Sequence, residues 1–150
     1  MRVFLRELTK EDVTENYLTG FQNENVTAFL EVDGKSLSVE DVIDYMEAGR
    51  NSGKYFMYAV CTNEGKHIGN LKVGPINHKN MTSDLVTVIW DEDYWGKGLA
   101  TESIKLGNKL AFEKYNIRKL TGGMYSSNIG SVKAYTKAGW IIEATLQNHY

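Results

Sequence analysis

The chain has one cysteine and one proline among 150 residues, and no long hydrophobic run. The single cysteine, Cys61, cannot form an internal disulfide, and its apolar surroundings are typical of an inert core thiol. No apolar stretch approaches the roughly 20 residues that a membrane-spanning helix needs. Charges at Arg2 and Arg6 come too early for a signal peptide. We therefore expect a cytoplasmic protein with no membrane partner.

The chain also lacks an excess of charge of either sign. Its formal net charge is −2, and no basic run appears along it, so the electrostatic footprint of a nucleic-acid-binding protein is absent. Hydrophobic residues make up 42% of the 150, which is enough to bury one core. Residues 1–150 are therefore expected to form a single domain.

The most informative segment runs from Asp84 to Glu102. Residues 85–90 are apolar and rich in β-branched side chains, which predicts a buried strand. Gly96 and Gly98 follow, and an amphipathic helix then begins. A strand, a glycine loop and a helix N-terminus together aim several main-chain N–H groups at one point, with the positive end of the helix dipole behind them. The predicted ligand is a phosphate or a pyrophosphate.

Two common phosphate loops do not fit this segment. A Walker A loop requires Ser or Thr after the Gly-Lys pair, but Lys97 is followed by Gly98. A dinucleotide fingerprint requires a third glycine where Thr101 stands and an acidic residue about twenty positions later, where the chain has Arg118 and Lys119. A plain glycine turn before a structural helix remains open.

A third pattern fits better. The run from Trp95 to Ala100 resembles the pyrophosphate loop of the GCN5-related N-acetyltransferases (GNAT), Gln/Arg-x-x-Gly-x-Gly/Ala, with Trp95 in place of the first polar residue. The segment from Asn128 to Trp140 resembles that family's later motif, Asn-x-x-Ser-x-x-x-Tyr-x-Lys-x-Gly-Phe. It also reads as a short helix that Gly139 ends. The resemblance extends more loosely from Phe4 to Tyr150 and is closest to the branch with ribosomal-protein, polyamine and amino-sugar acetyltransferases.

Periodicity and turn signals place the remaining elements. Strands are expected at residues 2–8, 55–61, 67–73, 85–90, 120–125 and from 141 onward. Helices are expected at residues 10–20, 39–50, 99–113 and 128–138, with a loop at 22–37.

The order β-α-α-β-β-β-α-β-α-β predicts an α/β fold, with a mixed twisted sheet flanked by helices. This agrees with the resemblance, which implies a sheet splayed near its fourth strand. The resemblance also implies one further strand that the chain lacks. We therefore expect a truncated chain or an edge completed by a partner, as in a homodimer.

The resemblance implies that acetyl-CoA is the cosubstrate, with its thioester along the strand at residues 88–90 and its pyrophosphate on the loop at 96–101. A larger side chain in place of Gly98 or Ala100 would fill space that the phosphates need. No metal site is expected. The cofactor-binding residues that the resemblance implies are Val88, Ile89, Trp90, Gly96, Lys97, Gly98, Leu99, Ala100, Thr101, Asn128 and Ser131.

Tyr135 matches the family tyrosine that protonates the thiolate of CoA. A phenol pKa near 10 lies above that of a thiol, so the hydroxyl stays a donor at neutral pH. The alternative is a tyrosine packed in the core.

The general base is left open. Gly123 stands where N-terminal acetyltransferases often have a glutamate. His78, in a loop before the central strand, is the first candidate to test, although solvated loop carboxylates or an ordered water chain are alternatives. The other candidates are Asp84, Asp91, Glu92, Asp93, His67 and His149.

The acceptor is expected to be a primary amine. Residues 66–72 and 74–77 look like bacterial family members encoded near surface-polysaccharide genes, which favours an amino-sugar nucleotide. Lys54, Lys72 and Lys79 could then bind its phosphates. A protein α-amine, a polyamine, and a CoA-binding module without turnover are the alternatives.

Overall fold

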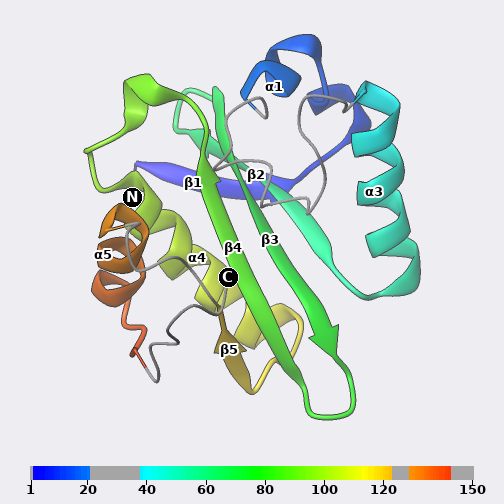
Figure 1. Ribbon diagram of the computed structural model, residues 1–150, viewed down its shortest axis with the longest axis vertical. Helices are drawn as coiled ribbons and strands as arrows, with labels where there is room; N and C mark the ends of the chain where they lie inside the picture. Colours follow the sequence, from blue (N-terminus) through cyan, green and yellow to red (C-terminus); the bar gives the residue numbers. More distant parts are fainter. Residues whose placement is uncertain (1, 21–37, 123–128, 143–150) are drawn as a thin grey trace, which may run out of the picture.

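The computed structural model describes residues 2–20, 38–122 and 129–142. Five strands form one sheet in the order β1-β2-β3-β4-β5 (Figure 1). Strands β1 to β4 pair with one another in antiparallel fashion, whereas β5 runs parallel to β4. Their bounds are Val3–Glu7 (β1), Phe56–Thr62 (β2), His67–Asn77 (β3), Thr82–Ile89 (β4) and Lys119–Thr121 (β5). The α/β fold with a mixed sheet is confirmed.

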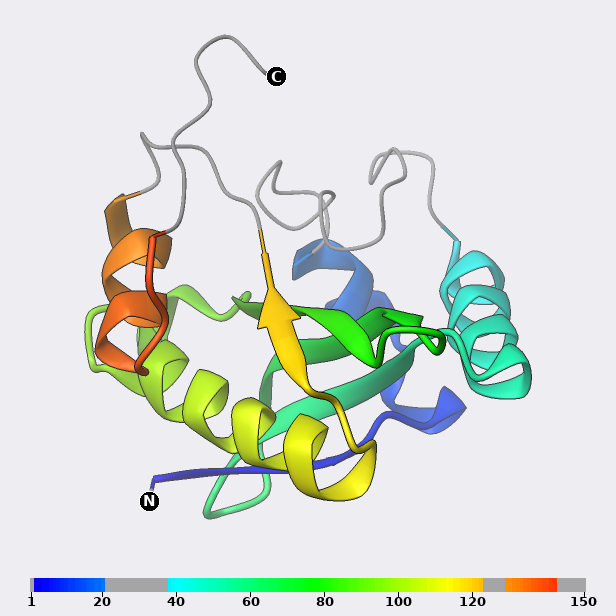
Figure 2. The same ribbon diagram turned by 90° about the horizontal axis from the view of Figure 1, so that it is seen from below.

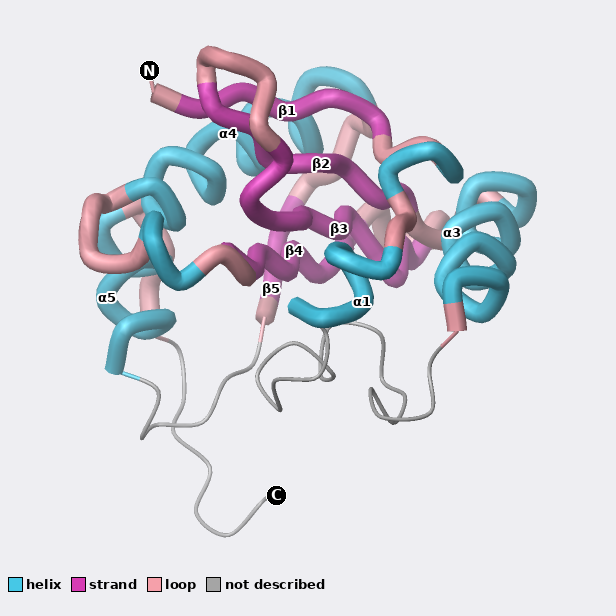
Figure 3. Tube along the Cα trace, turned by 90° about the horizontal axis from the view of Figure 1, so that it is seen from above, coloured by secondary structure: helices cyan, strands magenta, loops and turns pink. Residues whose placement is uncertain are grey.

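Helices cover both faces of the sheet (Figures 2 and 3). Helices α4 and α5 lie on one face, and α1 and α3 lie on the other. Their bounds are Glu15–Gly20 (α1), Val39–Ser52 (α3), Leu99–Lys114 (α4) and Ile129–Lys137 (α5). Short 3-10 turns stand at Lys10–Asp12 (η1) and Glu92–Tyr94 (η3).

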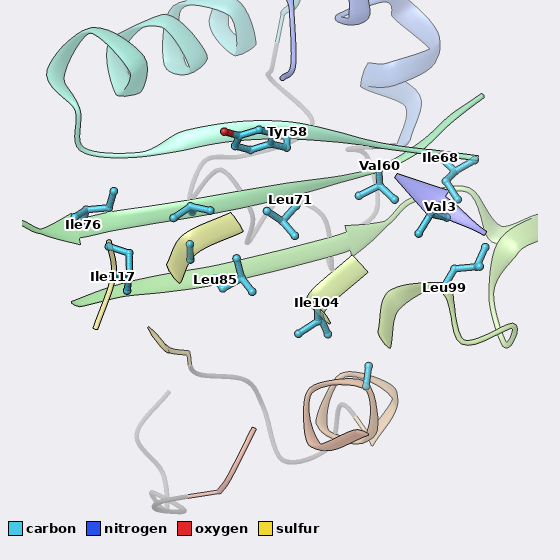
Figure 4. Close-up of a cluster of buried hydrophobic side chains, with 13 residues drawn as sticks. Val3, Tyr58, Val60, Ile68, Leu71, Ile76, Leu85, Leu99, Ile104 and Ile117 are labelled. Carbon is cyan, nitrogen blue, oxygen red and sulfur yellow. The ribbon is translucent and has the colours of Figure 1, made fainter. Parts of the chain in front are cut away.

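Strand alternation divides the buried side chains into two clusters. One lies between the sheet and α4 and α5 and includes Leu71, Leu85 and Ile104 (Figure 4). The other lies beneath α1 and α3 and includes Tyr17 and Val42. The two clusters fix β4, the strand that carries the candidate site, from both faces of the sheet.

The predicted helix at residues 10–20 is interrupted. Asp12 accepts a hydrogen bond from Thr9 N–H (2.8 Å) and ends a single 3-10 turn. Thr14 Oγ1 then accepts from Tyr17 N–H (3.3 Å) and starts a separate helix. Two competing caps thus divide the segment. The capping box of Ser38 and Asp41 and the left-handed stop at Gly139, by contrast, are present as expected.

Two predicted strands are longer in the structure and one is shorter. β3 continues past residue 73 because a bulge between Val73 and Ile76 accommodates Gly74-Pro75. β4 begins at Thr82, since its polar start pairs with β5. β5 ends at Thr121, and residues 123–128 lie outside the described range. Of the strand expected from 141, Ile141 and Ile142 are not in a strand, and the rest lies outside the described residues.

None of the helices in the described ranges is long and apolar enough to cross a membrane. The loop expected at residues 22–37 also falls outside those ranges.

Helix α4 packs closely on the sheet at Gly107. A Cβ placed there would lie 2.6 Å from Leu71 Cδ1 and 3.1 Å from both Leu85 methyl carbons. Gly107→Ala should therefore lower the free energy of unfolding by about 1–3 kcal/mol, the usual cost of overpacking. Urea unfolding measures the change.

Gly130→Ala is the matched control, because a Cβ at this helical position meets nothing within 4 Å. It should be neutral or stabilising by up to about 1 kcal/mol. If both variants behave alike, then close packing of α4 is not what requires Gly107.

Candidate active site

The candidate site lies where β4 and β5 part. The two strands pair only from Thr82 to Asp84, whereas β3 pairs with β4 as far as Ile89. Beyond Asp84, the outer edge of β4 therefore has no strand beside it among the described residues. Main-chain groups along such an edge are free to pair with an extended ligand.

The register shows which groups face this open edge. Trp90 N–H donates to Ile68 O (3.1 Å), so the main chain of Trp90 faces β3. Hydrogen-bonding direction alternates along an antiparallel strand, which turns Val88 inward as well. The outward main-chain groups belong to Leu85, Thr87 and Ile89. Of the three residues expected to bind the cosubstrate at 88–90, only Ile89 turns its main-chain groups to the open edge. Thr87 also does so, although no sequence motif pointed to it.

Tyr135 reaches this edge from α5. Its hydroxyl donates to Leu85 O (2.8 Å), and its ring lies edge-on against Trp140 at 4.9 Å. Burial raises the pKa of Tyr135 to about 12, while the nearby N–H and hydroxyl of Thr87 act in the opposite direction. The phenol therefore keeps its proton at neutral pH and remains a hydrogen-bond donor.

Trp95 closes the other end of the edge. Its indole Nε1–H donates to Ile89 O (2.7 Å), although 49% of the residue is exposed. The tryptophan that departs from the family pattern thus ties the glycine loop to the end of β4. Between Tyr135 and Trp95, the outward groups are the N–H and C=O of Thr87 and the N–H of Ile89, and none of them has a main-chain partner among the described residues.

The glycine loop leads into α4 with its amides uncapped. Gly98 is the N-cap residue and has no side chain, and the first helical hydrogen bond runs from Glu102 N–H to Gly98 O (3.2 Å). Gly96 and Gly98 have φ values of 73° and 77°, which favour glycine. A Cβ on Gly96 would meet nothing within 4 Å, so the space beside it is open. This geometry suits an anion.

The reason expected for Gly98 is not what the structure shows. A Cβ there would lie 3.3 Å from Arg2 Nη2, the flexible end of a side chain that pairs with Glu102. The left-handed backbone, rather than a crowded cradle, is what requires glycine at this position.

The other predicted cofactor residues fall in three groups. Leu99 packs into the core, and Ala100 and Thr101 lie beside it in the first turn of α4. Lys97 is exposed and places its ammonium 5.5 Å from the centre of the Tyr94 ring. Asn128 and the side chain of Ser131 lie outside what the structure describes.

A polar and aromatic cluster lies on the opposite face of the sheet. Asn70 Nδ2 donates to Tyr17 Oη (2.8 Å), which leaves its Oδ1 to accept from His67 Nε2 (2.8 Å). The rings of Tyr17 and His67 pack against Trp90 at 6.2 and 5.1 Å. Burial lowers the pKa of His67, so the imidazole is neutral at pH 7. Trp90 Nε1 is buried with no hydrogen-bond partner among the described residues.

A buried lysine lies on the same face. Lys72 is 4% exposed, stands opposite Val86 in the register and donates from Nζ to Tyr45 Oη (3.0 Å). Its ammonium also lies over the rings of Tyr45 and Tyr55 at 5.6 and 5.8 Å. A positive charge is thus held beside β4 on the face opposite α4 and α5.

The structure separates the candidates for the general base. Asp84 stands at the point where β4 and β5 part and accepts from Thr121 Oγ1 (3.0 Å). It directly precedes Leu85, whose carbonyl oxygen accepts the hydrogen bond from Tyr135 Oη. His78 instead contacts Gly53 O (2.7 Å), in the hairpin at the other end of β4 from the glycine loop.

The remaining candidates are engaged elsewhere or exposed. Asp91 caps η3 and pairs with Lys66 (3.2 Å), while Glu92 and Asp93 are exposed in the same turn. His149 lies outside the described residues. Within those residues, no group of three or more His, Cys, Asp or Glu side chains is arranged to hold a metal ion.

Residues 2–141 match the family profile described as an acetyltransferase (GNAT) domain. The chain is 23% identical over 149 residues to the probable N-acetyltransferase YjcK of Bacillus subtilis, covering 92% of this chain and 80% of that protein. It is 30% identical over 87 residues to the spermidine N(1)-acetyltransferase of Escherichia coli, covering 58% of this chain and 46% of that protein.

Solved structures of the same fold include a spermidine N-acetyltransferase from Vibrio cholerae in complex with CoA and spermine. It superposes with a TM-score of 0.83 at 19% identity, covering 97% of this chain and 84% of that one. A dodecameric structure of spermidine N-acetyltransferase from Vibrio cholerae superposes with a TM-score of 0.81 at 17% identity, covering 99% and 85%. At these identities the superpositions show the fold alone.

The neutral imidazole of His67 predicts a pH dependence of stability. Because its folded-state pKa lies below the unfolded value near 6.5, acid protonates the unfolded chain first. The free energy of unfolding should therefore fall as the pH drops from 7.5 to 5.5, as measured by urea unfolding. His67→Gln should be less stable at pH 7.5 but flatter across this range.

The carboxyl of Asp12 serves as an internal reference. Burial alone would raise its pKa, but hydrogen bonds from Arg6 and Thr9 lower it to about 2. Its contribution is consequently lost only below about pH 4. An equal slope between pH 7.5 and 5.5 in wild type and His67→Gln would contradict the assignment.

Proposed function

Since the chain belongs to the GNAT family of acetyltransferases, whose members use acetyl-CoA, we propose that it acetylates the primary amine of a small molecule at the open edge of β4. The observation that carries this proposal is the edge itself, where the outward main-chain groups between Tyr135 and Trp95 have no strand beside them within the described part of the chain. We further propose that residues 1–150 act as one acetyltransferase domain.

The residues on the edge fit a pantetheine chain and a pyrophosphate. Thr87 and Ile89 offer main-chain groups that an amide can pair with as an added strand does. Gly96, Gly98 and the uncapped start of α4 offer amides for the phosphates. When bound, acetyl-CoA supplies an activated acetyl thioester. Asn128 and Ser131 stay proposals from sequence alone.

Tyr135 is the proposed general acid. Its phenol keeps a proton at neutral pH and lies at the edge, so it can protonate the departing sulfur. Asp84 is the carboxylate beside it and the proposed group that takes the proton of the amine, directly or through one water. An outward main-chain N–H of β4 faces the space where negative charge develops on the acetyl oxygen.

The acceptor is the finer part of the proposal. Residues 66–72 and 74–77, which look like family members encoded near surface-polysaccharide genes, support an amino-sugar nucleotide. A polyamine is the second candidate, supported by the names of the spermidine acetyltransferases that the chain resembles. A homo-oligomer is proposed on the same basis, since one such relative is a dodecamer. A homodimer is the simplest form.

Gly96→Val should abolish protection by CoA. The substitution puts a branched side chain into the open space beside the loop and forces a left-handed backbone on a residue that resists it. CoA should raise the melting temperature of wild type but not that of the variant, as measured by a thermal shift titration.

Gly65→Val is the matched control. Gly65 has a φ of 91° and nothing within 4 Å of an added Cβ, but it lies in the β2–β3 turn. The Gly65→Val variant should have a similar backbone strain, and CoA should still raise its melting temperature. Equal protection of all three proteins would place the site away from the glycine loop.

A panel of amines tests the acceptor. With acetyl-CoA and a free-thiol readout, we expect turnover of at least one amino-sugar nucleotide, and none of peptides with a free N-terminus. Tyr135→Phe should lower kcat by about 10²–10⁴-fold while CoA still binds. Turnover of spermidine alone would replace the amino-sugar assignment with the polyamine one. If no amine is acetylated, the proposed function is wrong.

A further inference from the structure

Thr87 has a feature that packing does not explain. Its Oγ1 is fully buried on β4, and it makes no hydrogen bond within the described ranges. A buried hydroxyl without a partner costs about 1–3 kcal/mol, and native structures contain few of them. Such a hydroxyl is consistent with a group that gains its partner only when the site works.

The side chain of Thr87 lies close to the phenol of Tyr135. Leu85 and Thr87 are two residues apart on β4, so their main-chain groups face the same edge and their side chains the same face of the sheet. Tyr135 Oη is anchored on Leu85 O at 2.8 Å. The pKa of Tyr135 responds to both the N–H and the hydroxyl of Thr87, although burial is the largest influence.

We propose that Thr87 is a positioning residue, whose hydroxyl donates a hydrogen bond to Tyr135 Oη when that oxygen gives up its proton. The inference rests on the proposed function, because it assigns a proton transfer to Tyr135. It explains the unpaired hydroxyl, since the full acceptor strength of Oη exists only after the proton has left.

The proposed step moves one proton from Tyr135 to the leaving sulfur. As the carbon–sulfur bond breaks, its electron pair stays on sulfur, and Tyr135 Oη gives its proton to that sulfur. The resulting phenolate faces Leu85 O, a carbonyl that cannot donate to it. Thr87 supplies the side-chain donor, its Oγ1–H. Tyr135 then regains a proton from water, and the amine nitrogen loses one to Asp84 or to solvent.

A titration without turnover tests the contact directly. With 3,5-difluorotyrosine at position 135, the phenol ionises at a lower pH, and fluorine NMR follows it in the free protein. Thr87→Val, which keeps the shape of the side chain but removes the hydroxyl, should raise the ionisation midpoint. Thr87→Ser should restore it. An unchanged midpoint in Thr87→Val would overturn the proposal.

Kinetics provide the second measurement. Thr87→Val should lower kcat about tenfold, as expected for one hydrogen bond to a charged group, with the KM for acetyl-CoA little changed. In the Tyr135→Phe background the same substitution should cost nothing further. Thr136→Val, on the exposed side of α5 where the hydroxyl bonds Val132 O (2.6 Å), should leave kcat unchanged.

The two measurements separate the possible failures. If Thr87→Val costs the same factor with and without the phenol, then Thr87 acts independently of Tyr135 and the proposal is wrong. If the wild type acetylates no amine, the proposed function is wrong, while the fluorine titration still decides whether Thr87 acts on the phenol.

Discussion

The structure depends on a single break in strand pairing. β4 and β5 share three register pairs and then separate, and the main-chain groups past Asp84 must find other partners. Buried N–H and C=O groups rarely remain unpaired, because each costs as much as a lost hydrogen bond. The chain satisfies two of them with side chains, Tyr135 at one end and Trp95 at the other. The groups between them have no main-chain partner in the described part of the structure.

The packing on each face keeps that edge in place. On one face, α4 packs closely on the sheet at Gly107, and the same helix carries the loop amides at its N-terminus. On the other face, hydrogen bonds join the side chains of Tyr17, Asn70 and His67. The His67 ring packs against Trp90 at the end of β4. Neither the loop nor the edge can shift without disturbing a buried cluster.

The sequence predicted the order of elements well, because hydrophobic periodicity and caps such as Ser38 and Gly139 are local signals. It failed where the outcome depends on pairing between strands. The polar residues 82–84 became strand because β5 lies beside them, and the helix at 10–20 was divided by a second cap at Thr14.

The same limit applies to the site. Motifs identified Tyr135 and the glycine loop, and the structure gives both a consistent geometry. Thr87 carries no motif, and nothing local distinguishes it from other strand threonines; only the register with β3 and the approach of α5 select it. Conversely, His78 looked favourable in the sequence, but the turn of the hairpin carries it to Gly53.

Alternation along β4 has a consequence for solvent exchange. The amides of Val86 and Val88 point into the ladder with β3, whereas those of Thr87 and Ile89 point to an edge where residues 2–20, 38–122 and 129–142 place no strand. Amide deuterium uptake depends on such local pairing. Neighbouring residues of one strand should thus exchange at different rates in the free protein. A ligand lying along the edge would slow exchange of the Thr87 and Ile89 amides and leave exchange of the Val86 and Val88 amides unchanged. Deuterium uptake along β4 would therefore show whether a ligand is bound at the edge.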